Sequence, residues 1–318
     1  MQNTNCCRSC DPNNRTRVIS ILGKPVRVKN YICSADGVNY KMKPENVQLQ
    51  ISVCPTSYCP GSCPFCIAKD IKSKRMLDIE RFAYVMRLLK DEDRIRGVKI
   101  TGGEPFYDVE LLNEVVSVLF EIFGHKLEVS VSTNGIRLDQ LHRIKGLEYL
   151  DAVHISRHHY DDAVNKKIFG GADVPTGKKL TEIVSSVSFK DLFVFNCMLL
   201  KDYINSSDEA HKFLDFAIGT GVPKVGFMTC SPVNDFAKRQ MIPYESVLND
   251  NDPSMIFTRG FFDYGFCHCR DGIYASQSGD IIEFYGRSTN TDGCDYSRGL
   301  VYDADNRLRD GFGGEVII

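Results

Sequence analysis

The stretch "CPTSYCPGSCPFC", residues 54–66, places four cysteines in thirteen positions directly after the apolar run 47–53. Cys59, Cys63 and Cys66 are separated by three and then two residues. The residues between them that disfavour a helix are Pro60, Gly61 and Pro64. We therefore predict that these thiolates converge from a loop at the end of a strand, where parallel α/β folds build their sites.

Two metal sites fit this spacing. If Cys54 joins the other three cysteines, four thiolates make a closed structural zinc site. If only three of them bind, a [4Fe–4S] cluster keeps one iron without a protein ligand, open to a small chelating molecule. The choice between the two depends on motifs further along the chain.

Composition narrows the class of protein. The 318 residues include 39 Lys and Arg against 41 Asp and Glu, a formal net charge of −2, so we expect neither nucleic acid nor an anionic membrane surface as partner. No run approaches the roughly 20 apolar residues of a membrane helix, and the polar segment 1–17 lacks a signal-peptide core. We expect a cytoplasmic protein, in which the 13 cysteines favour metal or redox chemistry over disulfides.

Strand and helix patterns alternate from residue 47 to residue 230. Short runs rich in β-branched and aromatic residues predict strands at 47–53, 97–101, 127–132, 151–156, 192–200 and 224–229. Amphipathic runs predict helices at 79–91, 109–123, 138–144, 160–170, 177–187 and 207–221. Six such repeats predict right-handed crossovers and a parallel sheet, and the pattern alone leaves open whether the sheet closes.

The chain length suits one barrel-type α/β core with an appendage. We divide it into an N-terminal extension (1–46) with a small β region, the α/β core (47–235) and a β-rich C-terminal subdomain (236–318). Turns at Gly23–Pro25 and Asp36–Gly37 mark the N-terminal hairpins.

Polar motifs follow three further predicted strands. "ITGGEPF" places Gly102, Gly103 and Glu104 after the second strand, where absent side chains expose the backbone and a carboxylate can meet an ammonium group. The motifs "STNG" and "HISRHH" then place four more candidates after the third and fourth strands: Ser132, Asn134, Ser156 and Arg157. Each motif alone reads as a turn or a surface pair, but together they lie on the rim that carries the cysteine loop.

In this combination the CxxxCxxC triad, GGEP, STNG and Ser-Arg resemble the radical S-adenosylmethionine (SAM) superfamily over about residues 47–230. The resemblance implies a partial (β/α)6 TIM-like barrel and a [4Fe–4S] cluster whose open iron binds the amino and carboxylate groups of SAM. An electron from the cluster then cleaves SAM to a 5′-deoxyadenosyl radical, which abstracts a hydrogen from the substrate. An electron donor such as flavodoxin or ferredoxin is the implied partner.

Roles for individual residues follow from the same resemblance. Cys59, Cys63 and Cys66 would ligate the cluster, and Cys54 would not. The methionine ammonium of SAM would face Gly102, Gly103 and Glu104, and Phe65 would lie near the adenine. Candidates for ribose and carboxylate contacts are Ser132, Asn134, Ser156 and Arg157.

The C-terminal region supplies three more cysteines, Cys267, Cys269 and Cys294. Three thiols in a Gly-rich, β-rich segment favour a second iron–sulfur cluster over buried structural thiols. The region resembles the auxiliary-cluster (twitch or SPASM) extensions of the superfamily, although it separates its cysteines by one and then 24 residues. We therefore expect an auxiliary [4Fe–4S] cluster here.

The remaining candidates for chemical roles are further cysteines and two histidines. Cys230, at the end of the sixth strand, is a candidate hydrogen-atom donor to a substrate radical, with packing or ligation of the second cluster as alternatives. The trio Cys6, Cys7 and Cys10 is a candidate third metal site in a polar N-terminus. His158 and His159 suit either acid–base work or a polar loop.

The leading hypothesis is a radical SAM enzyme that oxidises, cyclises, cross-links or epimerises a peptide or natural-product-type substrate. One alternative is a radical SAM enzyme acting on a small metabolite such as a nucleotide or sugar. A different class of protein, a zinc or iron–sulfur binding module without turnover, is the second alternative.

Overall fold

The computed structural model describes residues 16–29, 31–33, 39–41, 47–68, 74–249, 251–258, 262–263, 266–287 and 299–318. Side chains are described for these residues apart from 29, 31–33, 39–41, 258, 262–263 and 266–270.

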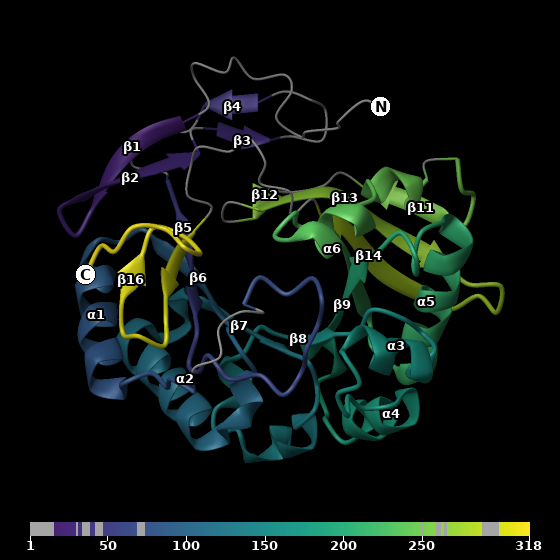
Figure 1. Ribbon diagram of the computed structural model, residues 1–318, viewed down its shortest axis with the longest axis horizontal. Helices are drawn as coiled ribbons and strands as arrows, with labels where there is room; N and C mark the ends of the chain where they lie inside the picture. Colours follow the sequence, from purple (N-terminus) through teal and green to yellow (C-terminus); the bar gives the residue numbers. More distant parts are fainter. Residues whose placement is uncertain are drawn as a thin grey trace.

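The core strands are β5 (Leu49–Val53), β6 (Ile95–Ile100), β7 (Glu128–Thr133), β8 (Ala152–Ser156), β9 (Phe193–Leu199) and β10 (Lys224–Thr229). Each pairs in parallel with the next along the chain. The six predicted strands and their parallel order are confirmed. The sheet curves without closing, and Figure 1 shows it lining the inside of an arc whose outside carries the helices.

In the part of the chain that the structure describes, six α-helices accompany these strands: α1 (Ile79–Asp91), α2 (Val109–Phe123), α3 (Asp162–Ile168), α4 (Gly177–Ser185), α5 (Ser207–Thr220) and α6 (Asp235–Gln240). Five of them match the predicted helices. The sixth prediction, 138–144, is instead a 3-10 helix, Leu138–Arg143. A segment this short between Gly135 and Gly146 adds too few hydrogen bonds to offset the cost of nucleating an α-helix.

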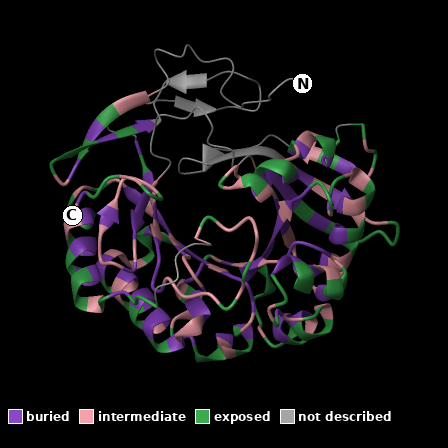
Figure 2. Cartoon of the chain, viewed as in Figure 1, coloured by how far each residue is buried: buried purple, intermediate pink, exposed green. Residues whose placement is uncertain are grey.

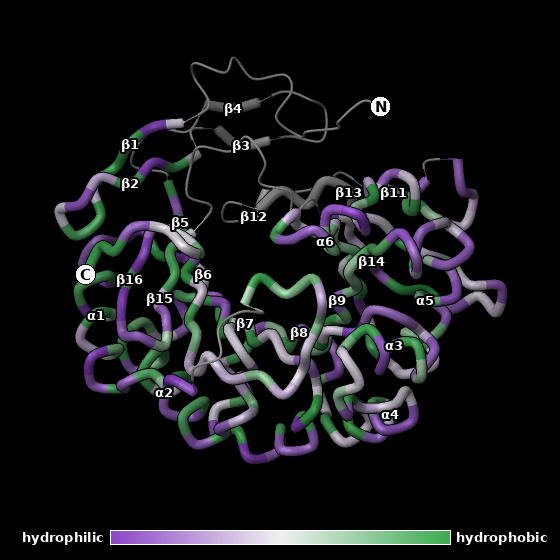
Figure 3. Tube along the Cα trace, in the orientation of Figure 1, coloured by the Kyte–Doolittle hydropathy of each residue, from purple (hydrophilic) through white to green (hydrophobic). Residues whose placement is uncertain are grey.

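Polar side chains cap the N-termini of the helices, and the apolar face of each helix packs against the sheet. Asp78, Asp108 and Asp161 accept hydrogen bonds from backbone N–H groups in the first turns of α1, α2 and α3. Figure 3 shows hydrophobic and hydrophilic residues alternating along these outer helices.

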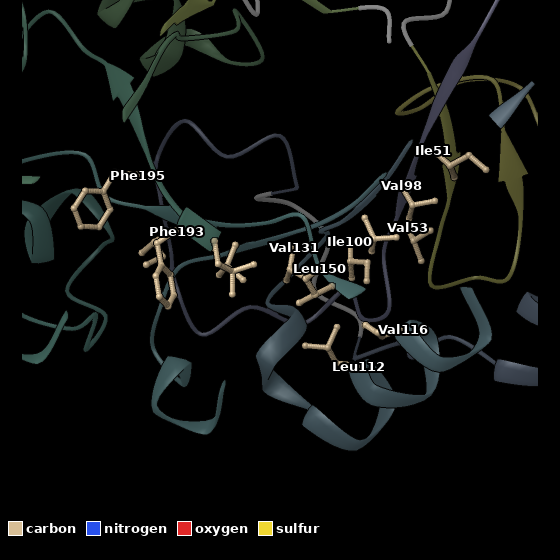
Figure 4. Packing of buried hydrophobic residues seen from close by; sticks show 14 of the residues in the cluster. Ile51, Val53, Val98, Ile100, Leu112, Val116, Val131, Leu150, Phe193 and Phe195 are labelled. Carbon is tan, nitrogen blue, oxygen red and sulfur yellow. The ribbon is translucent and has the colours of Figure 1, made fainter. Parts of the chain in front are cut away.

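The main hydrophobic core of the described residues lies between the helices and the outer face of the sheet. Figure 4 shows Leu112 and Val116 of α2 near Ile100 and Val131 of the sheet. These four side chains are at most 1% exposed. Because side chains alternate along a strand, the residues between the core positions project to the concave side, which we call the inner face.

Strands from both ends of the chain extend the structure. β1 (Thr16–Ile21) and β2 (Lys24–Lys29) form the predicted hairpin, and β3 (Tyr31–Cys33) pairs with β4 (Asn39–Lys41). The C-terminal strands are β11 (Met255–Thr258), β12 (Phe262–Asp263), β13 (Phe266–Ala275), β14 (Ile281–Arg287), β15 (Leu300–Tyr302) and β16 (Leu308–Arg309).

The C-terminal strands join the core sheet instead of forming a separate one. β14 pairs in parallel with β10, and β15 pairs in parallel with β5, so that 12 strands of the described ranges share one sheet. Residues 281–287 therefore add to one end of the inner face and residues 300–302 to the other. The domain division at 46 and 235 stays a prediction. The large sheet is continuous across residue 235, whereas β1–β2 and β3–β4 form two-stranded sheets of their own.

The length and polarity of the helices decide whether any of them could span a membrane. No helix in the described ranges combines the length and the hydropathy that a bilayer span needs.

Candidate functional site

The candidate site is built around the segment after β5, residues 54–68, which we call the cysteine loop. It lies in the concavity of the arc, and Figure 2 shows most of it at intermediate burial. Cys59, Cys63 and Cys66 are all of intermediate exposure, and none is in a disulfide. The loop is therefore reachable from the inner face while remaining partly shielded from water.

The segment after β6 supports the cysteine loop from below. The Gly103 N–H donates to Thr56 O (2.9 Å) and the Glu104 N–H donates to Tyr58 O (2.8 Å). A Cβ on Gly103 would lie 2.0 Å from Tyr58 O, and Gly102 has a φ of +109° with the space for a Cβ taken by Cys54. The double glycine is therefore required for the cysteine loop to pass directly over the end of β6.

Glu104 is 1% exposed, and its carboxylate binds this chain's own donors. It accepts hydrogen bonds from Thr133 Oγ1 (2.6 Å), Asn134 N (2.7 Å) and Phe106 N (3.0 Å). Burial raises the pKa of Glu104 to about 7, and these three hydrogen bonds oppose the shift. Glu104 thus ties the β6 and β7 ends together, and its contact with an ammonium group stays a prediction.

The opposite side of the cysteine loop rests on the segment after α3. The Ser62 N–H donates to Phe169 O (3.1 Å). Gly170, with φ +70°, leaves space that Ser62 fills, since a Cβ there would lie 2.7 Å from Ser62 O. Asn234, the N-cap of α6, donates from Nδ2 to Pro64 O (2.9 Å). These supports were missed at the sequence level, where only the glycine pair 170–171 hinted at a close approach.

Phe65 packs edge-on against the His158 ring, with centroids 5.2 Å apart, and His158 stacks on Phe169. His158 Nδ1 accepts a hydrogen bond from the Met198 N–H (3.1 Å). Burial, with a contribution from Arg157, lowers the pKa of His158 to about 3. His158 is therefore a neutral packing residue beneath the loop, while the proximity of Phe65 to adenine stays a prediction.

The three thiols interact electrostatically with one another. Burial, reinforced by Cys66 and Cys59, raises the pKa of Cys63 to about 12. Burial also raises the pKa of Cys59, although Asn134 Nδ2 donates to its sulfur (3.5 Å). Thiolates here need a positive partner, which iron supplies, so the donor set fits a cluster held by three cysteines. Across the described residues, no three His, Cys, Asp or Glu side chains form a site for one metal ion.

Cys54 has a different environment. It is 8% exposed, its N–H donates to Tyr302 O (2.9 Å), and burial raises its pKa to about 12. It packs beside Gly102 at the base of the cysteine loop. That Cys54 is not a ligand remains a prediction.

The residues after β7 and β8 that are candidates for contacts with SAM differ in how accessible they are. Asn134 adjoins Cys59, and Ser132 and Ser156 are half-buried on the inner face. Arg157 is 1% exposed, and its guanidinium donates to His159 O, Pro175 O, Tyr160 O and Asp162 Oδ1. Contact between Arg157 and SAM would require these bonds to break, so in this structure Arg157 holds its own loop together.

Cys230 follows β10 as expected but is only 1% exposed. It packs with Ile168, Leu200 and Ala237, and Phe65 borders this cluster. Burial raises the pKa of Cys230 to about 11. The geometry matches the packing alternative, and hydrogen-atom donation by Cys230 stays a prediction.

A cavity of about 640 Å³ opens beside the double glycine. Its walls include Thr101, Gly102 and Gly103, and several C-terminal residues between Val301 and Gly313. This volume is in the range of small-molecule sites. The C-terminal segment thus contributes directly to the space next to the cysteine loop.

Several predicted ligands cannot be placed. Cys6, Cys7, Cys10 and Cys294 lie outside the described residues, and Cys267 and Cys269 are described only as backbone in β13. The auxiliary cluster and the N-terminal metal site therefore stay predictions.

Curated relatives share part of the chain. A protein of Sulfurisphaera tokodaii named "Probable GTP 3',8-cyclase" is 33% identical over 187 residues, covering 58% of this chain and 56% of the relative. One of the same name from Methanococcus maripaludis is 25% identical over 217 residues, 68% of each. The chain spans about half the length of the first of these relatives.

Solved structures resemble the fold more distantly. Streptococcus suis SuiB bound to its precursor peptide SuiA has a TM-score of 0.48 at 18% identity, covering 62% of this chain and 43% of SuiB. A radical SAM methyltransferase from Sphaerobacter thermophilus has the same TM-score at 16% identity over 70% of both chains. These likenesses do not bear on the substrate.

The family model described as "Radical SAM superfamily" matches residues 53–214, just over half of the chain. The match begins at the end of β5 and includes the cysteine loop, the double glycine and the strand ends through β9. The chain belongs to the radical SAM superfamily.

Proposed function

We propose that this enzyme reductively cleaves SAM and abstracts a hydrogen atom from a substrate held on the inner face of the sheet. When bound, the [4Fe–4S] cluster supplies the electron for this cleavage, and the resulting 5′-deoxyadenosyl radical removes the hydrogen. The observation that carries the proposal is the cysteine loop, fixed by backbone hydrogen bonds over the double glycine at the end of β6.

The chain's own residues position the reactants. Cys59, Cys63 and Cys66 would hold the cluster, with Asn134 donating a hydrogen bond to the Cys59 sulfur. The methionine end of SAM would lie in the cavity beside Gly102 and Gly103, which the cysteine loop lines at Cys54, Thr56, Ser57, Ile67 and Ala68. Such fixed placement of reacting groups is the protein's main contribution to this type of catalysis.

Two further components belong to the proposal. An electron donor such as flavodoxin or ferredoxin would reduce the cluster. Cys267, Cys269 and Cys294 would hold an auxiliary [4Fe–4S] cluster in the C-terminal region.

For the substrate we favour a small metabolite such as a nucleotide over a peptide. The curated relatives are named as cyclases of GTP, and the inner face carries cationic side chains that suit an anionic molecule. A peptide or natural-product-type substrate is the competing possibility, which the same assay distinguishes.

The test is 5′-deoxyadenosine formation by anaerobically reconstituted protein with SAM and dithionite. We expect turnover by wild-type protein, and stimulation by GTP or another nucleotide if the favoured substrate class is correct. Cys63→Ala should abolish 5′-deoxyadenosine formation, whereas Cys54→Ala, a matched thiol at the base of the same loop, should retain it. Iron-loaded wild-type protein that never forms 5′-deoxyadenosine would overturn the proposal.

A further inference from the structure

Asn134 connects the segment after β7 to the cysteine loop. Its Nδ2 donates a hydrogen bond to the Cys59 sulfur (3.5 Å) across 75 residues of sequence. Asn134 is 8% exposed, so the bond is shielded from competing water. Hydrogen bonds in such surroundings are electrostatically stronger than those in water. The side chain of Asn134 thus acts directly on one of the three sulfur atoms that would hold the cluster.

The hydrogen bonds of Asn134 fix which end of its amide faces the sulfur. Its Oδ1 accepts from the Ile136 N–H (2.9 Å), and its backbone N–H donates to Glu104 Oε2 (2.7 Å). Gly135, with φ +82°, completes this turn. Because the amide oxygen is occupied within the turn, the NH2 group is the end left for Cys59.

Other donors to these sulfur atoms belong to the backbone of the cysteine loop itself. The Gly61 N–H donates to the Cys59 sulfur, and the Ala68 N–H donates to the Cys66 sulfur (3.4 Å). These bonds follow from the path of the loop. The bond from Asn134 is different, because a single substitution removes it without altering any residue of the loop.

We propose that Asn134 raises the reduction potential of the cluster held by the cysteine loop. Reduction adds one electron from an external donor, such as flavodoxin or ferredoxin, and forms or breaks no bond. A hydrogen bond to a ligating sulfur stabilises the added negative charge, so the reduced state gains more from the bond than the oxidised state does. Because Asn134 acts through Cys59, it is a positioning residue and not a catalytic residue.

This inference rests on the proposed function, which assigns the cluster to the cysteine loop. It adds to the SAM contact predicted for Asn134 a role toward the cluster itself. A higher potential makes the cluster easier to reduce, so the supply of the electron for SAM cleavage depends on this one amide group.

The experiment is a redox titration of the anaerobically reconstituted protein, with the reduced cluster followed by electron paramagnetic resonance. In Asn134→Ala the midpoint potential should fall. At a fixed potential, the ratio of reduced to oxidised cluster should drop about tenfold, equivalent to about 59 mV for a one-electron couple. This is the order of magnitude of one hydrogen bond to a charged atom.

A second variant separates this role from a structural one. Asn134→Asp keeps an oxygen that accepts from the Ile136 N–H, so the turn is retained, but it replaces the donor to Cys59 with a negative oxygen. Its midpoint potential should fall at least as far as that of Asn134→Ala. A residue needed only for the turn would leave the potential of Asn134→Asp at the wild-type value.

The matched control is Asn113→Ala in α2. The Asn113 amide likewise binds backbone groups, Arg143 O (3.0 Å) and the Lys145 N–H (2.8 Å), and none of the three sulfur atoms. Its loss should leave the midpoint potential unchanged. The signal to be titrated is the one that Cys63→Ala lacks, which identifies the cluster of the cysteine loop without reference to SAM.

Unchanged or higher midpoint potentials in both Asn134 variants would overturn the inference. The midpoint does not depend on how much cluster a variant holds, so whichever variant retains the cluster decides. Failure of both variants to bind a cluster would also overturn it, because Asn134 would then be a structural requirement. A lowered potential in a protein that never cleaves SAM overturns only the proposed function, and SAM cleavage with unshifted potentials overturns only this inference.

Discussion

At two glycines, Gly103 and Gly226, another part of the chain occupies the space that a Cβ would need, and the occupying groups differ. At the end of β6, the backbone of Tyr58 lies over Gly103, with its carbonyl oxygen 2.0 Å from where a Cβ would be. In the middle of β10, the ring of Tyr285 lies over Gly226 at 2.3 Å. The first glycine positions the cysteine loop, and the second positions a side chain of the inner face.

The difference predicts different consequences for the same substitution. A displaced backbone moves every residue attached to it, including the cluster ligands, because a peptide segment has few alternative paths. A displaced side chain can rotate away at the cost of its own contacts. Damage at Gly103 should therefore reach the cluster, whereas damage at Gly226 should stay on the inner face.

Gly103→Ala is expected to have the largest effect. The added methyl group forces the cysteine loop off the end of β6, so iron content and 5′-deoxyadenosine formation after reconstitution should fall to background. Gly97→Ala, on the same strand, is the control, because its Cβ would meet Gln50 at an ordinary 3.5 Å. A Gly103→Ala protein with wild-type iron content would show that the loop does not depend on this close approach.

Gly226→Ala should have a smaller effect, confined to the inner face. Overpacking against the Tyr285 ring should lower the free energy of unfolding by about 1–3 kcal/mol, while iron content stays at the wild-type level. Gly219→Ala in α5 has nothing within 4 Å of its Cβ and should not destabilise the protein. Loss of iron in Gly226→Ala would remove the distinction between the two glycines.

The smallest predicted effect concerns the aromatic support of the cysteine loop. The pKa of His158 is about 3 in the folded protein, below its usual value of about 6.5. The unfolded chain therefore binds the extra proton between these values, and stability is lost as the pH falls. From pH 7 to 5.5 we expect this group to reduce the free energy of unfolding by about 1 kcal/mol.

Chemical denaturation at both pH values checks this expectation against His158→Gln, whose amide oxygen can still accept from the Met198 N–H. The variant should lose the His158 part of the pH dependence. An equal pH slope in both proteins would mean that His158 is not held neutral beneath Phe65.

Much of the fold was predictable because it depends on periodic local patterns. The six core strands, five helices and the parallel order follow from apolar periodicity, caps and the constraints on crossovers. The joining of β14 and β15 to opposite ends of the sheet was not predictable. These are pairings between segments distant in sequence, and neither strand carries a signal for its partner.

The site was predictable in its residues more than in their geometry. The spacing of Cys59, Cys63 and Cys66 and the double glycine located the correct rim. Sequence could not reveal that Glu104 and Arg157 already bind this chain's own groups, because such partners are set by tertiary contacts. Gly226 was read only as part of a strand, since a glycine's role depends on which side chain crosses it.

The most direct test of the account is electron paramagnetic resonance of the dithionite-reduced, reconstituted protein before and after SAM is added. Variants lacking the C-terminal cysteines isolate the cluster held by the cysteine loop. We predict a [4Fe–4S] signal that changes when SAM binds, because three cysteines leave one iron open. A colourless zinc protein, or a cluster signal indifferent to SAM, would contradict the central claim.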